Sequence, residues 1–374
     1  MKRLNVGLIG SGFIGRAHAF AWRMAPAVFD LPLQASLQLL ADVDQATAER
    51  QAARLGIPAA TGDWQGLISN PDIDLIDITT PNSFHEPMAL AAIAAKKPVY
   101  CEKPLAPNAA TALKMAEAAE AAGVPTFVGF NYIKAPMAQY AREIAQSGEI
   151  GELWGFRGIH AEDYMTDPNG PWTWRLDPKG GAGAVADLGS HIVSLARFVV
   201  GEIDAVCADL DTCVKDRPVA PGASERRPVE VDDQARALVR FANGCKGTIE
   251  ASWVATGRTM HLAFELYGSK GSILLDMERM NELRLHVRKG GPANGYLTVP
   301  AGPAHPDYAP FCPAPGHQLG FNDVKTIEVK TVVECLAAGR RFYPDFREAY
   351  AIQRVVDAIL SSARERRWVD VREI

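Results

Sequence analysis

Two motifs in this sequence carry side chains suited to move a proton or stabilise negative charge: a Glu-Lys-Pro turn with Lys103, and "DLGSH" with Asp187 and His191. Asp187 and His191 are four residues apart in "AVADLGSHIVSLARFVV", which predicts a helix with both side chains on one face. An imidazole has an unperturbed pKa of about 6.5, so His191 is suited to take the proton of a hydroxyl group. Taken alone, each motif also has an ordinary explanation, because a Glu-Lys-Pro turn is usually solvated and "GSH" can simply start a helix.

The stretch "VYCEKPLA", residues 99–106, places Lys103 where a short apolar strand ends. Pro104 disfavours the α region for the residue before it and stiffens the turn. We therefore expect the ammonium group to leave the strand end, where it can stabilise a developing alkoxide or relay its proton to His191. Glu102 is expected to pair with Lys103 or to contact a cofactor.

The stretch "VGLIGSGFIGRAH" predicts a dinucleotide site. It follows a strand, opens a helix and carries the G-x-G-x-x-G spacing in Gly10, Gly12 and Gly15, which suits a pyrophosphate at the helix N-terminus. The next strand, "LQLLAD", ends at Asp42, whose carboxylate can accept hydrogen bonds from an adenosine ribose. No arginine follows to receive a 2′-phosphate, so NAD is predicted and NADP is less favoured. Asp42 could instead cap the next helix, although Asp44 is available for that role.

The element pattern predicts an α/β protein with two domains. Up to residue 130, short apolar runs alternate with alanine-rich amphipathic segments, which is typical of a Rossmann-type, doubly wound parallel sheet. From residue 131 to 374, long alternating runs with "ANG" and "GSKG" turns predict a large, mostly antiparallel sheet. Helices are expected over residues 45–55, 87–95, 109–122, 136–147, 321–338 and 345–366, and a long loop over 290–316.

Composition favours a small ligand. The net charge of −5 and the lack of basic clusters give no reason to propose nucleic acid or an anionic membrane as a partner. No segment has the roughly 18 consecutive apolar residues that a membrane span needs. The start, "MKRLNVGLIG", is expected to be a first strand rather than a leader. The six scattered cysteines predict reduced thiols in a cytoplasmic protein, and no metal site is expected.

In the order "GSGFIG", "TTPNSFH", "CEKPLA", "GFNY" and "DLGSH", the sequence resembles the Gfo/Idh/MocA oxidoreductases along nearly its whole length. The resemblance implies that Lys103, Asp187 and His191 form the catalytic group, and that the C-terminal sheet forms a homodimer or homotetramer. Many members carry an acid three residues after the histidine; here Ser194 stands instead, which puts the substrate contacts of that acid in doubt.

Other site residues follow from strand ends, from the resemblance and from position near the expected domain junction. The predicted cofactor-binding residues are Gly10, Gly12, Phe13, Ile14, Gly15, Asp42, Thr80, Asn82, His85, Glu102, Lys103, Asn131, Trp174 and Arg175. The predicted substrate-binding residues are Lys103, Tyr132, Asp163, Asp187, His191, His317 and Asn322.

The resemblance implies reversible, NAD-dependent oxidation of a ring secondary hydroxyl of a sugar or sugar-like polyol to the ketone. The stretches "DPNGPWTWR", "VDDQARALVRFANG" and "GPAHP" are most similar to members that act on levoglucosan, with C3 as the expected position. Three alternatives stay open: an inositol or other cyclitol dehydrogenase, a glycosidase that uses NAD for transient oxidation, and a sugar sensor without activity. The intact Lys103, Asp187 and His191 argue against the sensor.

Overall fold

The computed structural model describes residues 2–181, 183–292 and 294–374. The chain divides into two compact units, one running up to Lys134 together with Gly320–Ala351, the other comprising Ala135–Leu319 and Ile352–Ile374. The sequence predicted a single change of domain after residue 130. The structure differs because residues 320–351 return to the first unit, where the helix that follows Gly320 packs on the first helix of the chain.

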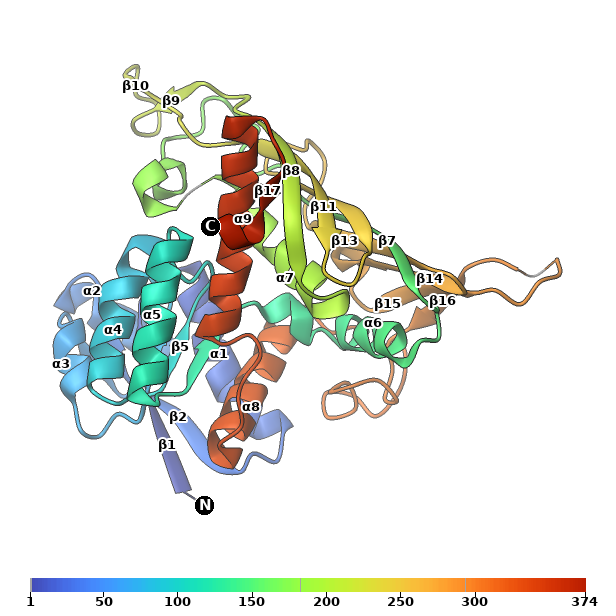
Figure 1. The fold of residues 1–374 in the computed structure, drawn as a ribbon. Helices are drawn as coiled ribbons and strands as arrows, with labels where there is room; N and C mark the ends of the chain where they lie inside the picture. The colour runs from blue at the N-terminus through green and yellow to red at the C-terminus, as the bar shows by residue number, and fades with distance from the viewer. Residues whose placement is uncertain (1, 182, 293) are drawn as a thin grey trace. The chain divides into compact units, whose positions relative to one another are not determined.

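The first unit is built on a six-stranded parallel sheet with the strand order β3-β2-β1-β4-β5-β6, as predicted for a doubly wound fold. Its strands are β1 (Lys2–Ile9), β2 (Leu33–Ala41), β3 (Ala59–Thr61), β4 (Leu75–Ile78), β5 (Val99–Cys101) and β6 (Thr126–Val128). Its helices are α1 (Phe13–Val28), α2 (Gln45–Leu55), α3 (Trp64–Ser69), α4 (His85–Ala94), α5 (Ala109–Ala122) and α8 (Phe321–Ala338). Helices α3, α4 and α5 stand side by side (Figure 1), and α1 packs against α8.

Local capping explains where several of these helices begin and end. The Asp44 carboxylate accepts a hydrogen bond from the Thr47 N–H at 2.7 Å and so caps α2. The Asn108 side chain accepts from the Thr111 N–H at 2.9 Å at the start of α5, and Gly123 ends this helix in the left-handed region at φ +63°. Asp44 therefore takes the capping role that was the alternative for Asp42.

The second unit carries a nine-stranded mixed sheet in the order β16-β15-β14-β13-β7-β12-β11-β8-β17. All neighbouring pairs are antiparallel except β7 and β12, which run parallel. The strands are β7 (Leu153–Ala161), β8 (Ile203–Asp211), β11 (Gln234–Phe241), β12 (Lys246–Ser252), β13 (His261–Gly268), β14 (Gly271–Asp276), β15 (Glu282–Val287), β16 (Leu297–Pro300) and β17 (Val369–Asp370). The mostly antiparallel sheet is thus confirmed, and Figure 1 shows its central strands side by side.

Besides short 3₁₀ segments, this part of the chain contains a small hairpin and longer helical segments. The hairpin pairs β9 (Asp216–Pro218) with β10 (Arg226–Pro228), and the helices are α6 (Pro136–Ser147), a π-helix over Val185–Gly189, α7 (Ser190–Val199) and α9 (Phe346–Glu365). The expected loop over residues 290–316 contains strand β16. No helix in the described part of the chain is both long and apolar enough to cross a membrane.

Candidate active site

The glycine-rich loop joins β1 to α1 and has the geometry of a phosphate-binding turn. Gly10 lies at φ +96°, and its N–H donates to the Ala41 carbonyl at 2.9 Å. A Cβ on Gly15 would stand 2.8 Å from the Thr79 hydroxyl oxygen, so the helix can approach the sheet only with glycine there. A Cβ on Gly12 would meet no atom within 4 Å. The start of α1 is therefore open to a ligand where the loop presents its backbone.

Asp42 follows the end of β2 beside this loop. Its Oδ1 accepts from the Val43 N–H at 2.7 Å, and its Oδ2 accepts from the Ser11 hydroxyl. These two bonds fix the orientation of the carboxylate at the strand end. Among the flanking residues, Phe13 is 72% exposed and stacks on Phe321, with ring centroids 5.9 Å apart.

The predicted residues after β4 and β6 differ in how buried they are. Asn82 is buried, Thr80 is half-buried, and Ile14 beside the glycine loop is half-buried too. Asn131 is 3% exposed, and its side-chain Nδ2 has no hydrogen-bond partner among the described residues. A buried donor without a partner is costly unless a ligand supplies the acceptor. This orphaned amide and the open space at Gly12 fit a dinucleotide.

His85 is fully buried and braces two turns rather than facing solvent. Its Nδ1 lies 3.0 Å from the Pro104 carbonyl oxygen and its Nε2 lies 2.9 Å from the Thr80 carbonyl oxygen. Burial lowers the pKa of His85, although both carbonyls favour the protonated ring. The imidazole thus links the turn after β4 to the turn that carries Lys103, and its direct contact with cofactor stays a prediction.

Glu102 turns inward and is 4% exposed. Its Oε1 lies 2.9 Å from His18 Nε2 and accepts from Lys325 Nζ at 2.8 Å, while its Oε2 accepts from the Lys103 backbone N–H at 3.0 Å. Glu102 thus binds the backbone of Lys103, while the predicted pairing of the two side chains and the contact of Glu102 with a cofactor stay predictions. Lys103 itself is half-buried, and its peptide bond to Pro104 is cis.

In the second unit, Asp187 is held by two neighbours. Its Oδ2 accepts from the Tyr164 hydroxyl at 2.8 Å and from Arg175 Nε at 3.1 Å. Arg175 also stacks on Trp174, with its guanidinium carbon 4.4 Å from the ring centroid. Burial and the Asp187 carboxylate raise the pKa of Tyr164, so the phenol stays a neutral donor. Arg175 was predicted to bind the cofactor; here it pairs with Asp187, and the cofactor contact remains a prediction.

The segment that carries Asp187 and His191 is less regular than predicted. Residues Val185–Gly189 form a π-helix, whose hydrogen bonds span five residues, and the α-helix α7 begins only at Ser190. The four-residue spacing therefore does not correspond to one regular α-helical turn. Such π turns occur frequently at functional sites. His191 is 6% exposed, and its ring centroid lies 5.4 Å from that of His160.

His160 and Asp232 support this segment, and neither was predicted from the sequence. His160 in β7 is buried, with Nδ1 2.9 Å from the Leu188 carbonyl oxygen and Nε2 3.1 Å from Glu162 Oε1. Asp232 Oδ2 accepts from the Val185 N–H at 2.8 Å, at the start of the π-helix. The visible signal for Asp232 was a pair of acids in "VDDQARA" just before a strand.

Burial raises the pKa of Asp232 to about 6 even though the Val185 N–H favours its charged form. Because the folded-state pKa is raised, the stabilising contribution of this group is present below about pH 4 and is lost as the pH rises through about 6. The rise of the Asp232 pKa from 3.8 to about 6 corresponds to about 3 kcal/mol in the free energy of unfolding. We expect the urea midpoint of the wild type to fall, relative to that of Asp232→Asn, between pH 4.5 and pH 7.5. Asp209→Asn, at an exposed position in β8, is the control, and parallel pH curves would contradict the assignment.

The other predicted substrate residues lie in different surroundings. Asp163 Oδ2 accepts from the Gly257 N–H at 3.0 Å and so holds a loop. Tyr132 is half-buried in the first unit, 6.2 Å from the Phe321 ring between centroids. His317 is exposed in the second unit and Asn322 is exposed in the first, so these two belong to different units. Ser194 is 1% exposed in α7, and its hydroxyl has no partner among the described residues.

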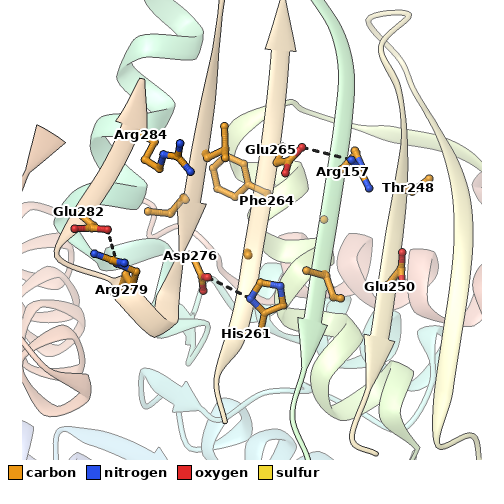
Figure 2. A pocket seen from close by; sticks show the side chains of 15 residues that line it. Arg157, Thr248, Glu250, His261, Phe264, Glu265, Asp276, Arg279, Glu282 and Arg284 are labelled. Atoms are coloured by element: carbon orange, nitrogen blue, oxygen red, sulfur yellow. Dashed lines mark ion pairs between the residues drawn. The ribbon is translucent and has the colours of Figure 1, made fainter. Parts of the chain in front are cut away.

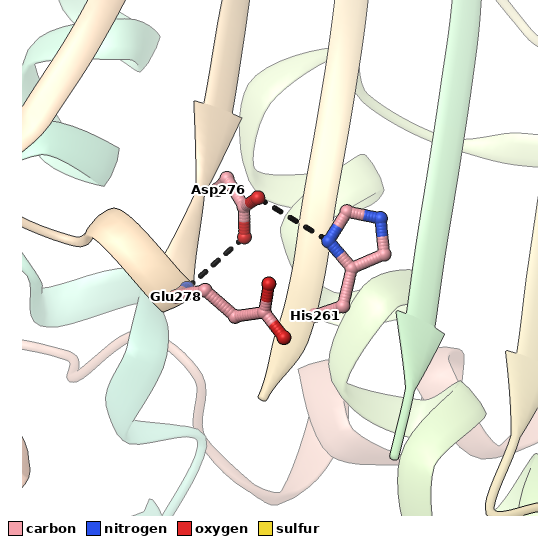
Figure 3. A group of neighbouring side chains, drawn as sticks. All are labelled: His261, Asp276 and Glu278. Carbon is pink, nitrogen blue, oxygen red and sulfur yellow. Dashed lines mark hydrogen bonds and ion pairs between the residues drawn. The ribbon is translucent and has the colours of Figure 1, made fainter. Parts of the chain in front are cut away.

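A second polar region lies on the nine-stranded sheet, where a shallow hollow of about 380 Å³ crosses several strands. Figure 2 shows its paired charges: Arg157 lies 3.6 Å from Glu265, and His261 lies 3.3 Å from Asp276. Side-chain atoms of His261, Asp276 and Glu278 lie within 4.8 Å of one another (Figure 3). The Glu278 carboxylate already accepts from Arg258 at 2.8 Å and from the Thr259 N–H at 3.2 Å. We therefore assign this group to the folding of the β13 and β14 ends.

Comparison with known proteins agrees with this geometry. Residues 4–130 match the oxidoreductase family with an NAD-binding Rossmann fold, and residues 138–274 match the GFO/IDH/MocA C-terminal domain. The fold and the cofactor site define an NAD-binding oxidoreductase that acts on CH–OH groups. The chain belongs to the Gfo/Idh/MocA family.

Two sequence relatives and one solved structure are similar to most or all of this chain. The chain is 36% identical to levoglucosan dehydrogenase of Pseudarthrobacter phenanthrenivorans over 388 aligned residues, covering 100% of both chains. A structure of levoglucosan dehydrogenase in complex with NADH and levoglucosan superposes with a TM-score of 0.96 at 37% identity, covering 99% of this chain and 100% of that one. Myo-inositol 2-dehydrogenase of Thermotoga maritima is 29% identical over 297 residues, 79% of this chain and 81% of that protein.

Proposed function

We propose that this protein oxidises a ring secondary hydroxyl of a sugar, levoglucosan or a close analogue, to the ketone in a reversible reaction, with C3 as the reacting carbon. The observation that carries the proposal is the similarity to levoglucosan dehydrogenase along the full length of both chains. The pairing of Asp187 with Tyr164 and Arg175 supports it, because it fixes the orientation of a carboxylate four residues before His191 in the chain.

NAD held at the glycine loop would supply the acceptor for the hydride that leaves the carbinol carbon. His191 takes the hydroxyl proton, so the C–H and O–H electron pairs end in the cofactor and in the new carbonyl bond. Asp187, held by Tyr164 and Arg175, orients the imidazole or binds a neighbouring hydroxyl. Lys103 stabilises the negative charge that develops on the oxygen or relays its proton. The residues proposed to bind the sugar ring itself are Tyr132, Asp163, His317 and Asn322.

The cofactor is held, in this proposal, by the glycine loop and by residues at the carboxyl ends of the parallel strands. Asp42 receives the adenosine ribose hydroxyls and disfavours a 2′-phosphate, and Asn131 offers its orphaned Nδ2 to the nicotinamide side. NAD is therefore the proposed physiological cofactor, ahead of NADP.

Asp42→Ala tests this preference. Hydrogen bonds to a charged group contribute about 1.5–3 kcal/mol, so we expect the Kd for NAD to rise about tenfold or more, since each 1.4 kcal/mol is a factor of ten. The Kd for NADP is expected to change less, or to fall, because a like charge beside its phosphate is removed. Titration of protein fluorescence with each cofactor measures both values. Asp44→Ala, which removes the α2 cap, is the matched control, and an unchanged NAD/NADP ratio in Asp42→Ala would refute the role.

A cyclitol dehydrogenase is the second candidate, favoured by the similarity to myo-inositol 2-dehydrogenase. A panel of levoglucosan, inositols, free aldoses and glycosides, each with NAD and NADP, separates the candidates by NADH or NADPH formation at about 340 nm. Highest kcat/KM on levoglucosan supports the proposal, and highest kcat/KM on an inositol overturns it. Hydrolysis of a glycoside without net NADH would point to transient oxidation instead.

We further propose that the protein forms a homodimer or homotetramer through the nine-stranded sheet. Along β11 buried and exposed residues alternate, and the exposed set includes Leu238, 51% exposed between Arg236 and Arg240. The paired charges of the hollow in Figure 2 lie on the same sheet and give both signs for a second copy to meet. Sedimentation equilibrium at two salt concentrations tests this association.

The six cysteines are free thiols, and the cytoplasmic location stays a prediction.

A further inference from the structure

A network of five buried charged residues is in contact with the turn that carries Lys103. His18 Nδ1 lies 2.9 Å from Asp77 Oδ1, and its Nε2 lies 2.9 Å from Glu102 Oε1. Lys325 Nζ then donates to Glu102 at 2.8 Å and to Glu328 at 2.7 Å. All five residues are at most 4% exposed. They come from α1, from the ends of β4 and β5, and from α8, all in the first unit.

In this network, each ionised side chain is kept in its charged form by the opposite charges beside it. Burial alone would raise the pKa of Glu102, but Lys325 and His18 lower it well below its usual range. Burial likewise opposes protonation of His18 and Lys325, yet the carboxylates beside them raise both pKa values. Because both ring nitrogens of His18 face carboxylate oxygens, the doubly protonated imidazolium satisfies both contacts. Glu102 is thus a permanent buried anion held from two sides.

This network contacts the Lys103 turn through the backbone of Lys103. Glu102 uses Oε1 for Lys325 and His18, and its Oε2 accepts from the Lys103 N–H at 3.0 Å. On the other side of the same turn, His85 Nδ1 lies 3.0 Å from the Pro104 carbonyl oxygen. A carboxylate that is itself held at one oxygen can fix a donor at the other much more rigidly than a solvated side chain could.

We propose that Lys325 and His18 are positioning residues for Lys103, acting through Glu102 on the backbone of its turn. This inference rests on the proposed function in one respect, namely that Lys103 contacts the reacting hydroxyl. Lys325 lies 223 residues from Glu102 in sequence, so helix α8 from the far end of the chain supplies part of the machinery of the β5 turn. Lys325 therefore differs from a residue that only stabilises the fold through an ion pair, because its contact with Glu102 leads to the backbone of the catalytic lysine.

The kinetic test is a double-mutant cycle. Lys325→Met keeps the aliphatic stem and removes the charge, and the pair Lys325→Met with Glu328→Gln removes the surplus negative charge as well, so one variant remains testable if the other fails to fold. We expect kcat to fall about 10- to 100-fold, the cost of misplacing a catalytic group by a fraction of an ångström or more, with KM for the sugar and Kd for NADH changed less than about twofold. In a Lys103→Ala background the same substitutions should lower kcat by less than about twofold.

The matched control is Lys330→Met, on the same helix, where Lys330 is half-buried and its Nζ lies 3.6 Å from Glu334. Its kcat is expected to equal that of the wild type. Losses that multiply in the Lys103→Ala background, or an equal loss in Lys330→Met, would overturn the proposal, because a structural effect of α8 does not depend on the lysine side chain at 103.

A second measurement does not depend on catalysis. Hydrogen–deuterium exchange at the Lys103 amide, followed by mass spectrometry with fragmentation, should accelerate at least tenfold in Lys325→Met and stay unchanged in Lys330→Met. Equal protection in both variants would refute the positioning role. If no sugar or cyclitol yields NADH while the exchange result holds, the proposed function fails and the coupling from Lys325 to the Lys103 turn stands.

Discussion

We expect Lys103→Ala to lower kcat by about 10²–10³-fold, the loss typical when one donor to a developing oxyanion is removed. The Kd for NADH is expected to change less than about twofold, because the glycine loop, Asp42 and Asn131 remain. The measurements are NADH formation with levoglucosan under saturating conditions and fluorescence titration with NADH. The physical reason is that the other charged side chain of the Glu-Lys-Pro turn, Glu102, is an anion and cannot stabilise a developing alkoxide.

Lys114→Ala is the matched control for this variant. Lys114 is 64% exposed and pairs with Glu86 at 2.8 Å on the surface of the same unit, so its loss should leave kcat unchanged. Full activity in Lys103→Ala would contradict the catalytic role. A large rise in the Kd for NADH with unchanged kcat would instead make Lys103 a cofactor-binding residue.

His191→Asn is expected to have an effect at least as large, about 10²–10⁴-fold on kcat, the usual contribution of a general base. Asparagine keeps a polar side chain against the His160 ring but cannot accept the hydroxyl proton. We therefore expect kcat of the wild type to decline toward acid pH, where a histidine base is protonated, and this decline to disappear in the variant. Rates measured from pH 5 to pH 10 at saturating sugar and NAD give both results.

His286→Asn, in β15 near the edge of the nine-stranded sheet, controls for the general loss of a histidine. An acid limb that persists in His191→Asn and disappears in Lys103→Ala would assign the proton to the lysine. Unchanged kcat in His191→Asn would remove the histidine from the reaction altogether.

Local signals were sufficient for much of the fold. The predicted helices over residues 45–55, 109–122, 136–147 and 321–338 have these bounds in the structure, because each has its own periodicity and most have a capping residue or glycine at an end. Short elements were missed, among them β3, α3 and β17, since two to six residues are too few for a period to show. The regular helix expected around Asp187 was wrong in detail, because the π turn at residues 185–189 has no local signature.

The sequence by itself determined the class of protein and predicted which side chains do the chemistry, because the glycine loop and the Glu-Lys-Pro turn are each contained in a few consecutive residues. Only the tertiary structure decided what holds them. Lys325 reaches Glu102 across 223 residues, and Asp232 reaches Val185 across 47. In the sequence these are ordinary charged residues. Their roles depend on which partner lies beside them once water is excluded, and that is set by packing between segments far apart in the chain.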